Sequence, residues 1–360
     1  MAGKPVTLPP AKDIPTTMTT LHAPLRSFGT APDGSSVTLI HLQHAGTSAR
    51  IMTWGASLQD LRIAGVEHSL VLGSPDFAAY LQKMWHFGAI AGPVANRIAH
   101  GRAPLDGRMI ELERNDNQRN ALHGGSLGCG VSNWTLEQAD QRSCVLHFCN
   151  PAASPLPGRL ELRAHYRLDD DGALLLEITA STDQLTWCSP AHHSYWNLDG
   201  STTLAAHSLE IAADSYLPVD EHRIPLGAPQ TVAGTRFDFR TPRPITLPGD
   251  SPLDHNFCLR RPGEWAAARD QTLQPVCQLR AAEVTLDIHS TEPGLQVYDA
   301  GRMDTHPAVG HQGAPYGAFA GVALEPQHWP DAPNHPEYPS IVLEPDQHCY
   351  QCSRFHAYVR

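Results

Sequence analysis

One carboxylate of this chain stands where an apolar run gives way to a proline-rich polar loop, in the segment LEPQHWPDAPNHPEYPS. Glu325 follows the run FAGVAL, so we expect it at the end of a buried strand. A buried carboxylate is costly unless it is paired or partly hydrated, and such groups often have shifted pKa values and take part in chemistry. Glu325 is therefore a candidate acid–base residue.

Two histidine segments supply further candidates. In SPAHHSYWNLDG, His192 and His193 are adjacent, and adjacent residues on a strand point to opposite faces, so at most one of them faces a given site. An imidazole beside aromatic rings suits a sugar pocket, but it also suits a core histidine with a satisfied partner. His123 precedes two glycines in NALHGG, which allow a sharp turn and close approach of a ligand. A plain turn with an exposed histidine is the alternative.

Hydrogen-bonding side chains occur in three other segments. Asn96 and Arg97 lie in GPVANRIAHGRAPLDG, and a guanidinium donates several hydrogen bonds to a polyhydroxylated or anionic ligand. A surface arginine in a salt bridge is the alternative. Asp254 lies in SPLDHNFCL and Gln296 in TEPGLQVYDAG. Both side chains are suited to binding hydroxyl groups.

The elements that must position these residues are mostly strands. Short alternating runs separated by turn residues recur along the chain, as in RLELRAHYRLDDDGALLLEITAST. The best helical window is DFAAYLQKMW, residues 76–85. Strands without alternating helices predict an all-β fold, a large antiparallel β-sandwich or barrel with few short helices. Because no shift in composition divides the chain, we expect a flexible N-terminal arm over residues 1–25 and one β domain over residues 26–360.

Composition excludes several classes of partner. The net charge is -11, from 26 basic and 37 acidic residues, and no dense Lys/Arg cluster interrupts this acidity. Nucleic acid and anionic membranes are therefore poor partners. A hydrophobic content of 41% with 18% charged residues is typical of a globular protein with a sizeable core. No apolar run reaches membrane-spanning length, and the N-terminus lacks an apolar leader, so we expect a cytoplasmic protein.

Metal and redox chemistry are not predicted. The eight cysteines are expected to be reduced thiols, and only Cys349 and Cys352 form a C-x-x-C pair. No second pair lies at zinc-ribbon spacing, and H-E-x-x-H is absent among the 21 histidines. The sequence therefore predicts neither a metal site nor a cofactor.

Taken in order, the segments resemble the aldose 1-epimerases, or galactose mutarotases. The resemblance runs from about Phe28 to Arg360 and rests on VANRIAHGRAPLDG, ALHGG, HHSYWNL, LDHNF, TEPGLQVY and LEPQHWPDAPNHPEYPSIVLEPDQHCY. It implies an antiparallel β-sandwich with an open sugar-binding cleft, acting on a free aldose to interconvert its α and β anomers. The chain departs from the family at Pro93 in GPVANRI, where the family often has arginine or another polar residue.

The resemblance also implies residue roles. The general base matches Glu325, and the general acid matches His193, which directly precedes SYWN, rather than His192. If the two groups lie close together, each would stabilise the charged form of the other. The sugar-binding positions of the family match Asn96, Arg97, His123, Asp254 and Gln296.

Two other functions remain open at this level. A hexose-6-phosphate mutarotase should bring two or more basic groups to a phosphate, and only Arg97 is clearly placed for that. A non-catalytic sugar-binding protein on the same fold is the second alternative. Trp85, Trp196 or Trp329 would stack on the sugar, or would pack in the core. The preferred aldose and the oligomeric state are not predicted.

Overall fold

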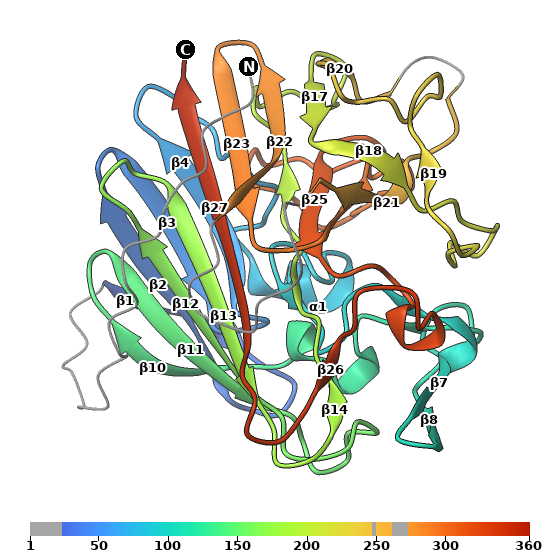
Figure 1. The fold of residues 1–360 in the computed structure, drawn as a ribbon. Coiled ribbons are helices and arrows are strands. Elements are labelled where there is room, and N and C mark those ends of the chain that lie inside the picture. Colours follow the sequence, from blue (N-terminus) through green and yellow to red (C-terminus); the bar gives the residue numbers. More distant parts are fainter. Residues whose placement is uncertain (1–23, 247–249, 261–272) are drawn as a thin grey trace.

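A nine-stranded antiparallel sheet forms one layer of the computed structural model, which describes residues 24–246, 250–260 and 273–360 (Figure 1). Its strands follow the order β10 (Thr135–Ala139), β11 (Ser143–Cys149), β12 (Glu161–Leu168), β13 (Leu174–Ser181), β27 (Cys349–Val359), β23 (Val284–Ser290), β22 (Gln274–Ala281), β17 (Ser208–Ile211) and β20 (Arg243–Pro244). In β12, Leu162, Ala164 and Tyr166 are buried and alternate with partly exposed polar residues. This period-two pattern buries one face of the sheet.

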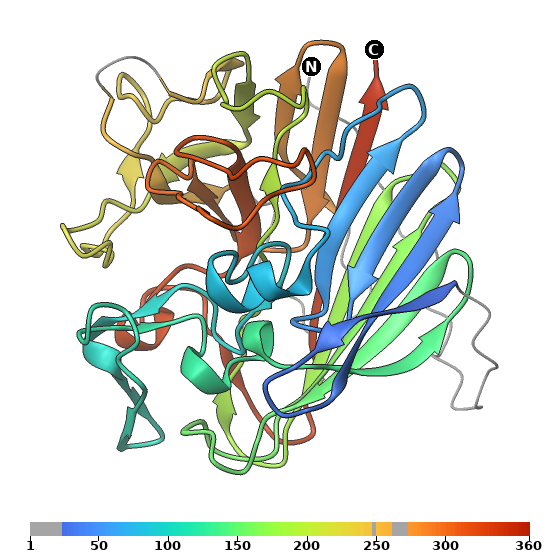
Figure 2. The same ribbon diagram turned by 180° about the vertical axis from the view of Figure 1, so that it is seen from behind.

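Two smaller sheets form the opposing layer. One has the order β16 (Tyr195–Trp196), β25 (Val322–Gln327), β24 (Gly294–Tyr298), β21 (Asp254–Leu259), β18 (Ala213–Tyr216) and β19 (Gln230–Thr231). The other has the order β1 (Leu25–Thr30), β2 (Ser36–His44), β3 (Thr47–Met52) and β4 (Ser57–Ile63). Figure 2 shows the four-stranded sheet lying over the end of the large sheet that holds β10 to β13. One hydrophobic core joins all three sheets, which confirms the predicted β-sandwich.

Short elements connect the layers. Four two-stranded pairs are present among the described residues, namely β5 (Ile90–Ala91) with β15 (Ala191–His192), β6 (Arg97–Ile98) with β9 (Ala121–Leu122), β7 (Arg102–Leu105) with β8 (Arg108–Glu111), and β14 (Thr186–Trp187) with β26 (Val342–Leu343). Single 3-10 turns occur at η1 (Ala99–Gly101), η2 (Gly125–Leu127), η3 (Cys129–Val131) and η4 (Ala332–Asn334). The predicted helix is present as α1 (Phe77–Gln82), and the Asp76 side chain caps it by accepting a hydrogen bond from Ala78 N at 3.0 Å.

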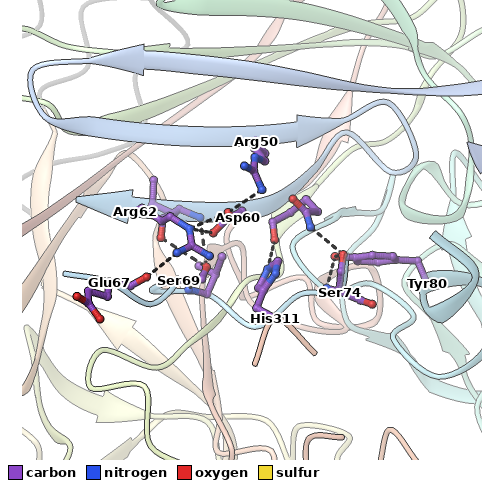
Figure 3. Close-up of polar contacts among 11 residues, drawn as sticks. Arg50, Asp60, Arg62, Glu67, Ser69, Ser74, Tyr80 and His311 are labelled. Atoms are coloured by element: carbon purple, nitrogen blue, oxygen red, sulfur yellow. Dashed lines mark hydrogen bonds and ion pairs between the residues drawn. The ribbon is translucent and has the colours of Figure 1, made fainter. Parts of the chain in front are cut away.

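A buried polar network holds α1 against the four-stranded sheet (Figure 3). The backbone carbonyl of Gln59 accepts a hydrogen bond from His311 Nε2 at 2.8 Å, and the Gln59 amide donates to Ser74 O at 2.7 Å. Ser74 N in turn donates to the hydroxyl of Tyr80 on α1 at 2.9 Å. Every link is a hydrogen bond between buried or half-buried groups, so the network fixes the segment at Ser74, which precedes α1, against β4 and the helix.

The same figure shows a buried carboxylate next to this network. Asp60 on β4 is only 2% exposed, and its Oδ2 lies 3.0 Å from Arg62 Nε and 3.3 Å from Arg50 Nη1. Two guanidinium groups therefore compensate the desolvation of one carboxylate.

Several expectations concern the chain ends and the cysteines. The expected flexible arm over residues 1–25 lies almost wholly outside the described residues, which begin at residue 24. All eight cysteines are free thiols, and Cys349 and Cys352 both lie on β27. In the part of the chain that the structure describes, no helix is long and apolar enough to cross a membrane.

Candidate active site

Glu325 lies in the interior of a strand, not at its end as the sequence predicts. All six residues of β25 are buried, and Glu325 is 2% exposed. The strand continues through Pro326 because β16 pairs only with the first two residues of β25. Pro326 has no backbone N–H to donate. Because β16 does not pair with β25 beyond Ala323, no hydrogen bond between these two strands is lost at Pro326. The Pro326 carbonyl accepts a hydrogen bond from Gln351 Nε2 at 3.1 Å, which anchors the strand beside the carboxylate.

The two adjacent histidines point in opposite directions, as the sequence predicts. His192 ends β15 and turns inward, where its ring lies 5.1 Å from Phe355 and its Nε2 lies 3.1 Å from Ser194 Oγ. His193 turns to the other side, and its Nε2 lies 3.7 Å from Glu325 Oε1. Only His193 therefore reaches the carboxylate.

Asn96 and His123 hold each other in place. Asn96 N donates to His123 Nδ1 at 3.1 Å, and His123 N donates to Asn96 O at 3.0 Å. Because Nδ1 accepts a hydrogen bond, the neutral imidazole carries its proton on Nε2 and offers that N–H as a donor. Both residues have left-handed backbones, with φ of 60° for Asn96 and 52° for His123. Such strained conformations are concentrated at functional sites.

Arg97 lies between two carboxylates. Its Nε donates to Asp116 Oδ2 at 2.9 Å, and its Nη1 lies 3.8 Å from Asp254 Oδ2. Oδ1 of Asp254 accepts a hydrogen bond from Gln296 Nε2 at 2.6 Å. Gln296 pairs directly with Glu325 across β24 and β25, so their side chains share one face of the sheet.

The structure thus brings all the sequence-predicted site residues together. The His123 ring centroid is 5.2 Å from that of His193, which completes the set of contacts. Each residue neighbours the next, and the last neighbours the first, in the order Glu325, His193, His123, Asn96, Arg97, Asp254 and Gln296. We call this ring of residues the polar circuit. Most of these side chains are buried, while those of Arg97 and Asp254 are 12% and 15% exposed.

Sequence reasoning missed Arg223. Its Nε lies 2.7 Å from Asp254 Oδ2, so the carboxylate is fixed from one side by Arg223 and from the other by Gln296. Arg223 lies in the turn after Val219 and has a left-handed backbone with φ of 63°. No motif marks it, because the contact depends on how the loop between β18 and β19 meets Asp254 at the start of β21.

Tyr195 also contributes to the site. Its ring lies 5.1 Å from the His193 ring, and the residue is 7% exposed. Tyr195 pairs with Ala323 across β16 and β25, two residues before Glu325 on the same face. The sequence alone identifies Tyr195 only as an aromatic residue close to His192 and His193.

Burial shifts the pKa values of Glu325 and His193 in opposite directions. It raises the pKa of Glu325 well above its usual value, Asp254 raises it further, and Arg97 opposes both. Burial lowers the pKa of His193 to about 4. The expectation that the two residues sustain each other's charged forms is therefore wrong for the free site. The reason is that both groups lose more hydration than their contact restores.

Several buried polar atoms in the circuit have no hydrogen-bond partner within the described residues. They are His193 Nδ1, Glu325 Oε2 and Gln296 Oε1. Buried polar groups are normally satisfied, so three such atoms in one site indicate a place for a polar ligand. No group of three or more His, Cys, Asp or Glu side chains is arranged to hold a metal ion, as far as the described residues extend.

The tryptophans have different environments. Trp196 is fully buried and stacks on Phe355 at 5.5 Å, so it belongs to the core. Trp329 donates its Nε1–H to Pro293 O at 3.2 Å and packs against Tyr338. Trp329 therefore braces the loop after Glu325. Trp85 is 63% exposed.

Hydrogen bonds connect the loop after Glu325 to the segment that contains Arg97. Asp331 is buried, its N donates to Arg97 O at 3.1 Å, and its Oδ1 accepts a hydrogen bond from Ala99 N at 3.0 Å. The proline-rich loop therefore links the strand that carries Glu325 to the segment that carries Arg97.

A buried carboxylate and imidazole, surrounded by hydrogen-bonding side chains, are chemically suited to proton transfer. On a two-layer antiparallel sandwich, this arrangement fits an enzyme that acts on a carbohydrate. Residues 38–354 match the family model for aldose 1-epimerase. The chain therefore belongs to the aldose 1-epimerase family, whose enzymes are isomerases.

Named relatives support this assignment across most of the chain. Galactose mutarotase of Rattus norvegicus is 34% identical over 330 residues, covering 89% of this chain and 94% of the relative. Aldose 1-epimerase of Escherichia coli is 34% identical over 331 residues, covering 86% and 91%. Among solved structures, an aldose epimerase homologue from C. elegans has a TM-score of 0.81 at 27% identity, covering 89% and 98%. Galactose 1-epimerase from Lactobacillus acidophilus has a TM-score of 0.80 at 25% identity, covering 94% and 99%.

Proposed function

We propose that this protein interconverts the α and β anomers of a free aldose such as galactose or glucose, with Glu325 as general base and His193 as general acid. The observation that supports this most directly is the 3.7 Å separation between Glu325 Oε1 and His193 Nε2 inside a buried polar circuit. A sugar placed against both groups would present its C1 hydroxyl to one and its ring oxygen to the other.

The reaction then needs only protons to move. The Glu325 carboxylate takes the proton of the C1 hydroxyl while His193 donates a proton to the ring oxygen. The bond between C1 and the ring oxygen breaks, and an open-chain aldehyde results. Rotation about the C1–C2 bond by about half a turn presents the other face of the carbonyl. The same two groups, in reversed roles, close the ring, and each contributes roughly 10² to 10⁴ in rate.

The free and reactive states of the pair hold the same number of protons. Burial favours a protonated Glu325 and a neutral His193. The reactive form has the proton on His193 instead, so it is reached by redistribution within the pair, without loss of a proton to solvent. Arg97 favours this form because it lowers the pKa of Glu325.

The remaining residues of the circuit are proposed to bind the sugar. His123 offers an Nε2–H donor, and the guanidinium of Arg97 provides positive charge near oxygens whose charge changes during ring opening. Asp254 and Gln296 would bind hydroxyl groups. A site with such buried polar groups discriminates against sugars that lack the matching hydroxyl.

The charge balance of the site favours a neutral sugar over a sugar phosphate. Arg223 adds a second guanidinium to Arg97, but Asp116 and Asp254 already engage the two. A hexose-6-phosphate site would need positive charge in excess of the carboxylates that surround it. Arg97 and Arg223 supply no such excess.

Polarimetry tests the proposal. The protein should accelerate the change in optical rotation of freshly dissolved α-galactose or α-glucose, and Glu325→Gln or His193→Asn should remove most of that acceleration. Glu292→Gln is a matched control, because Glu292 is also buried and lies 2.9 Å from an imidazole, that of His328. A wild-type rate equal to the buffer rate with galactose, glucose and other common aldoses would overturn the proposal.

The same assay separates the alternatives. Acceleration only with glucose 6-phosphate would indicate the sugar-phosphate enzyme. Binding of aldoses without any acceleration, measured by calorimetry, would indicate a non-catalytic sugar-binding protein.

A further inference from the structure

A third imidazole lies beside the two that the proposed reaction uses. The ring centroid of His86 is 4.9 Å from that of His123 and 6.4 Å from that of His193. His86 follows α1 and is half-buried. No sequence motif singles it out.

The backbone couples His86 to the catalytic histidine. Ala89 N donates to His86 O at 3.1 Å, and His193 N donates to Ala89 O at 2.8 Å. Gly88 N donates to His193 O at 2.9 Å in the same turn. The turn that places His86 is therefore fixed against the backbone of His193.

The side chain of His86 has unused hydrogen-bonding capacity. Its Nδ1 is buried without a partner, facing Gly130, where an added Cβ would lie 2.7 Å from this nitrogen. Within the described residues, no hydrogen bond engages either ring nitrogen. Burial, with a smaller effect of His193, lowers the pKa of His86 to about 3, so near neutral pH the ring is uncharged and has one donor and one acceptor.

Two energetic costs meet at this residue. An unsatisfied buried polar atom destabilises the fold. The left-handed backbone of His86, with φ of 62°, is a second unfavourable feature for a residue other than glycine. His289 on β23 also has a buried Nδ1 without a partner, but it lies in a regular strand outside the site. The coincidence of both costs beside His123 and His193 distinguishes His86 from such a structural histidine.

We propose that His86 binds substrate, and that its Nε2, the ring nitrogen that does not face Gly130, forms a hydrogen bond with one hydroxyl of the aldose on the His123 side of the site. This inference rests on the proposed function. Glu325 and His193 would hold the C1 hydroxyl and the ring oxygen, so His86 contacts one of the other hydroxyl groups and contributes to the choice of aldose.

A substitution series combined with deoxy sugars tests this contact. His86→Leu removes both ring nitrogens, and kcat/KM for the parent sugar should fall about 10-fold, as for loss of one hydrogen bond in a buried site. His86→Gln keeps a polar group at similar reach and should retain most of the activity. With the monodeoxy sugar that lacks the contacted hydroxyl, wild type and His86→Leu should have equal kcat/KM.

The deoxy comparison separates binding from a structural effect. A structural defect would lower kcat/KM by the same factor for the parent sugar and for every monodeoxy sugar, and that result would overturn the proposal. An unchanged kcat/KM for His86→Leu with all sugars would overturn it as well. His289→Leu is the matched control and should change none of these ratios.

A second variant covers the case in which His86→Leu does not fold. Asparagine tolerates a left-handed backbone, but its side chain is shorter, so His86→Asn should fold and lose the contact. We then expect the difference in kcat/KM between wild type and His86→Asn to disappear with the monodeoxy sugar that lacks the contacted hydroxyl. Wild-type activity is measured in each experiment, so a failure of the proposed function would show there, independently of His86.

Discussion

His193 Nε2 and Glu325 Oε1 approach to 3.7 Å although their residues are placed by different sheets. His193 directly follows β15, which pairs with the short strand β5, while Glu325 lies within β25 of the six-stranded sheet. Both residues are buried, and burial moves their pKa values apart. The directions of these shifts favour a pair that carries one proton, on Glu325 rather than on His193.

This relationship predicts the pH dependence of activity. Below the pKa of His193, about 4, the pair gains a second proton and Glu325 no longer acts as a base. Above the raised pKa of Glu325 the pair loses its last proton and His193 no longer acts as an acid. We expect kcat/KM from polarimetry to be flat between these limits, with an acid limb near pH 4. An acid limb near 6.5, the usual pKa of histidine, would contradict this assignment.

Removing the charge of Asp254 should move the alkaline limb. The Asp254 carboxylate raises the pKa of Glu325, so Asp254→Asn should lower that pKa and shift the alkaline limb to lower pH. The overall rate should also fall, because a proposed hydroxyl ligand is altered. Asp116→Asn is the control, since Asp116 is the other carboxylate partner of Arg97. A shift to higher pH in Asp254→Asn would refute the electrostatic account.

Arg223 should affect substrate binding more than turnover. Its Nε lies 2.7 Å from Asp254 Oδ2, and the two side chains are 20% and 15% exposed. Charge-assisted hydrogen bonds of this kind are worth about 1.5–3 kcal/mol, so Arg223→Gln should raise KM roughly 10-fold or more through loss of the fixed carboxylate. Arg223→Lys should restore part of the effect. Initial-rate polarimetry at several sugar concentrations separates KM from kcat, and a fall in kcat alone would count against this role.

The sequence predicts those features of the site that arise locally. Alternation along a strand separates His192 from His193, and the apolar run before Glu325 predicts its burial. The alternating pattern of β12 likewise predicts a half-buried strand. These inferences are correct because each depends only on the residue pattern within a single strand.

Features that depend on distant partners were beyond sequence reasoning. β27 inserts between β13 and β23, and nothing in the local pattern of β27 specifies these neighbours. Arg223 and His86 reach the site through turns with left-handed backbones, at residues other than glycine, where sequence gives no signal. The pKa directions were also missed, because desolvation is set by the packing of three sheets and not by adjacent residues.

The buried carboxyl group of Glu325 should reduce the stability of the fold where it is ionised. The pKa of Glu325 is raised well above its usual value of 4.5, so the folded state binds the proton more tightly than the unfolded state. The stability that this group contributes is full below the unfolded pKa and is lost as the pH rises through the folded pKa. Each unit of pKa difference corresponds to about 1.4 kcal/mol.

Glu325→Gln should therefore be more stable than the wild type at neutral and alkaline pH, and similar to it near pH 4. Urea unfolding at several pH values measures the difference. Glu283→Gln, at an exposed turn between β22 and β23, serves as the control and should not alter the pH dependence. A Glu325→Gln protein less stable than the wild type at alkaline pH would show that the carboxylate is compensated within the fold. The gain in stability would accompany the loss of activity, as expected where a catalytic group is held in an unfavourable environment.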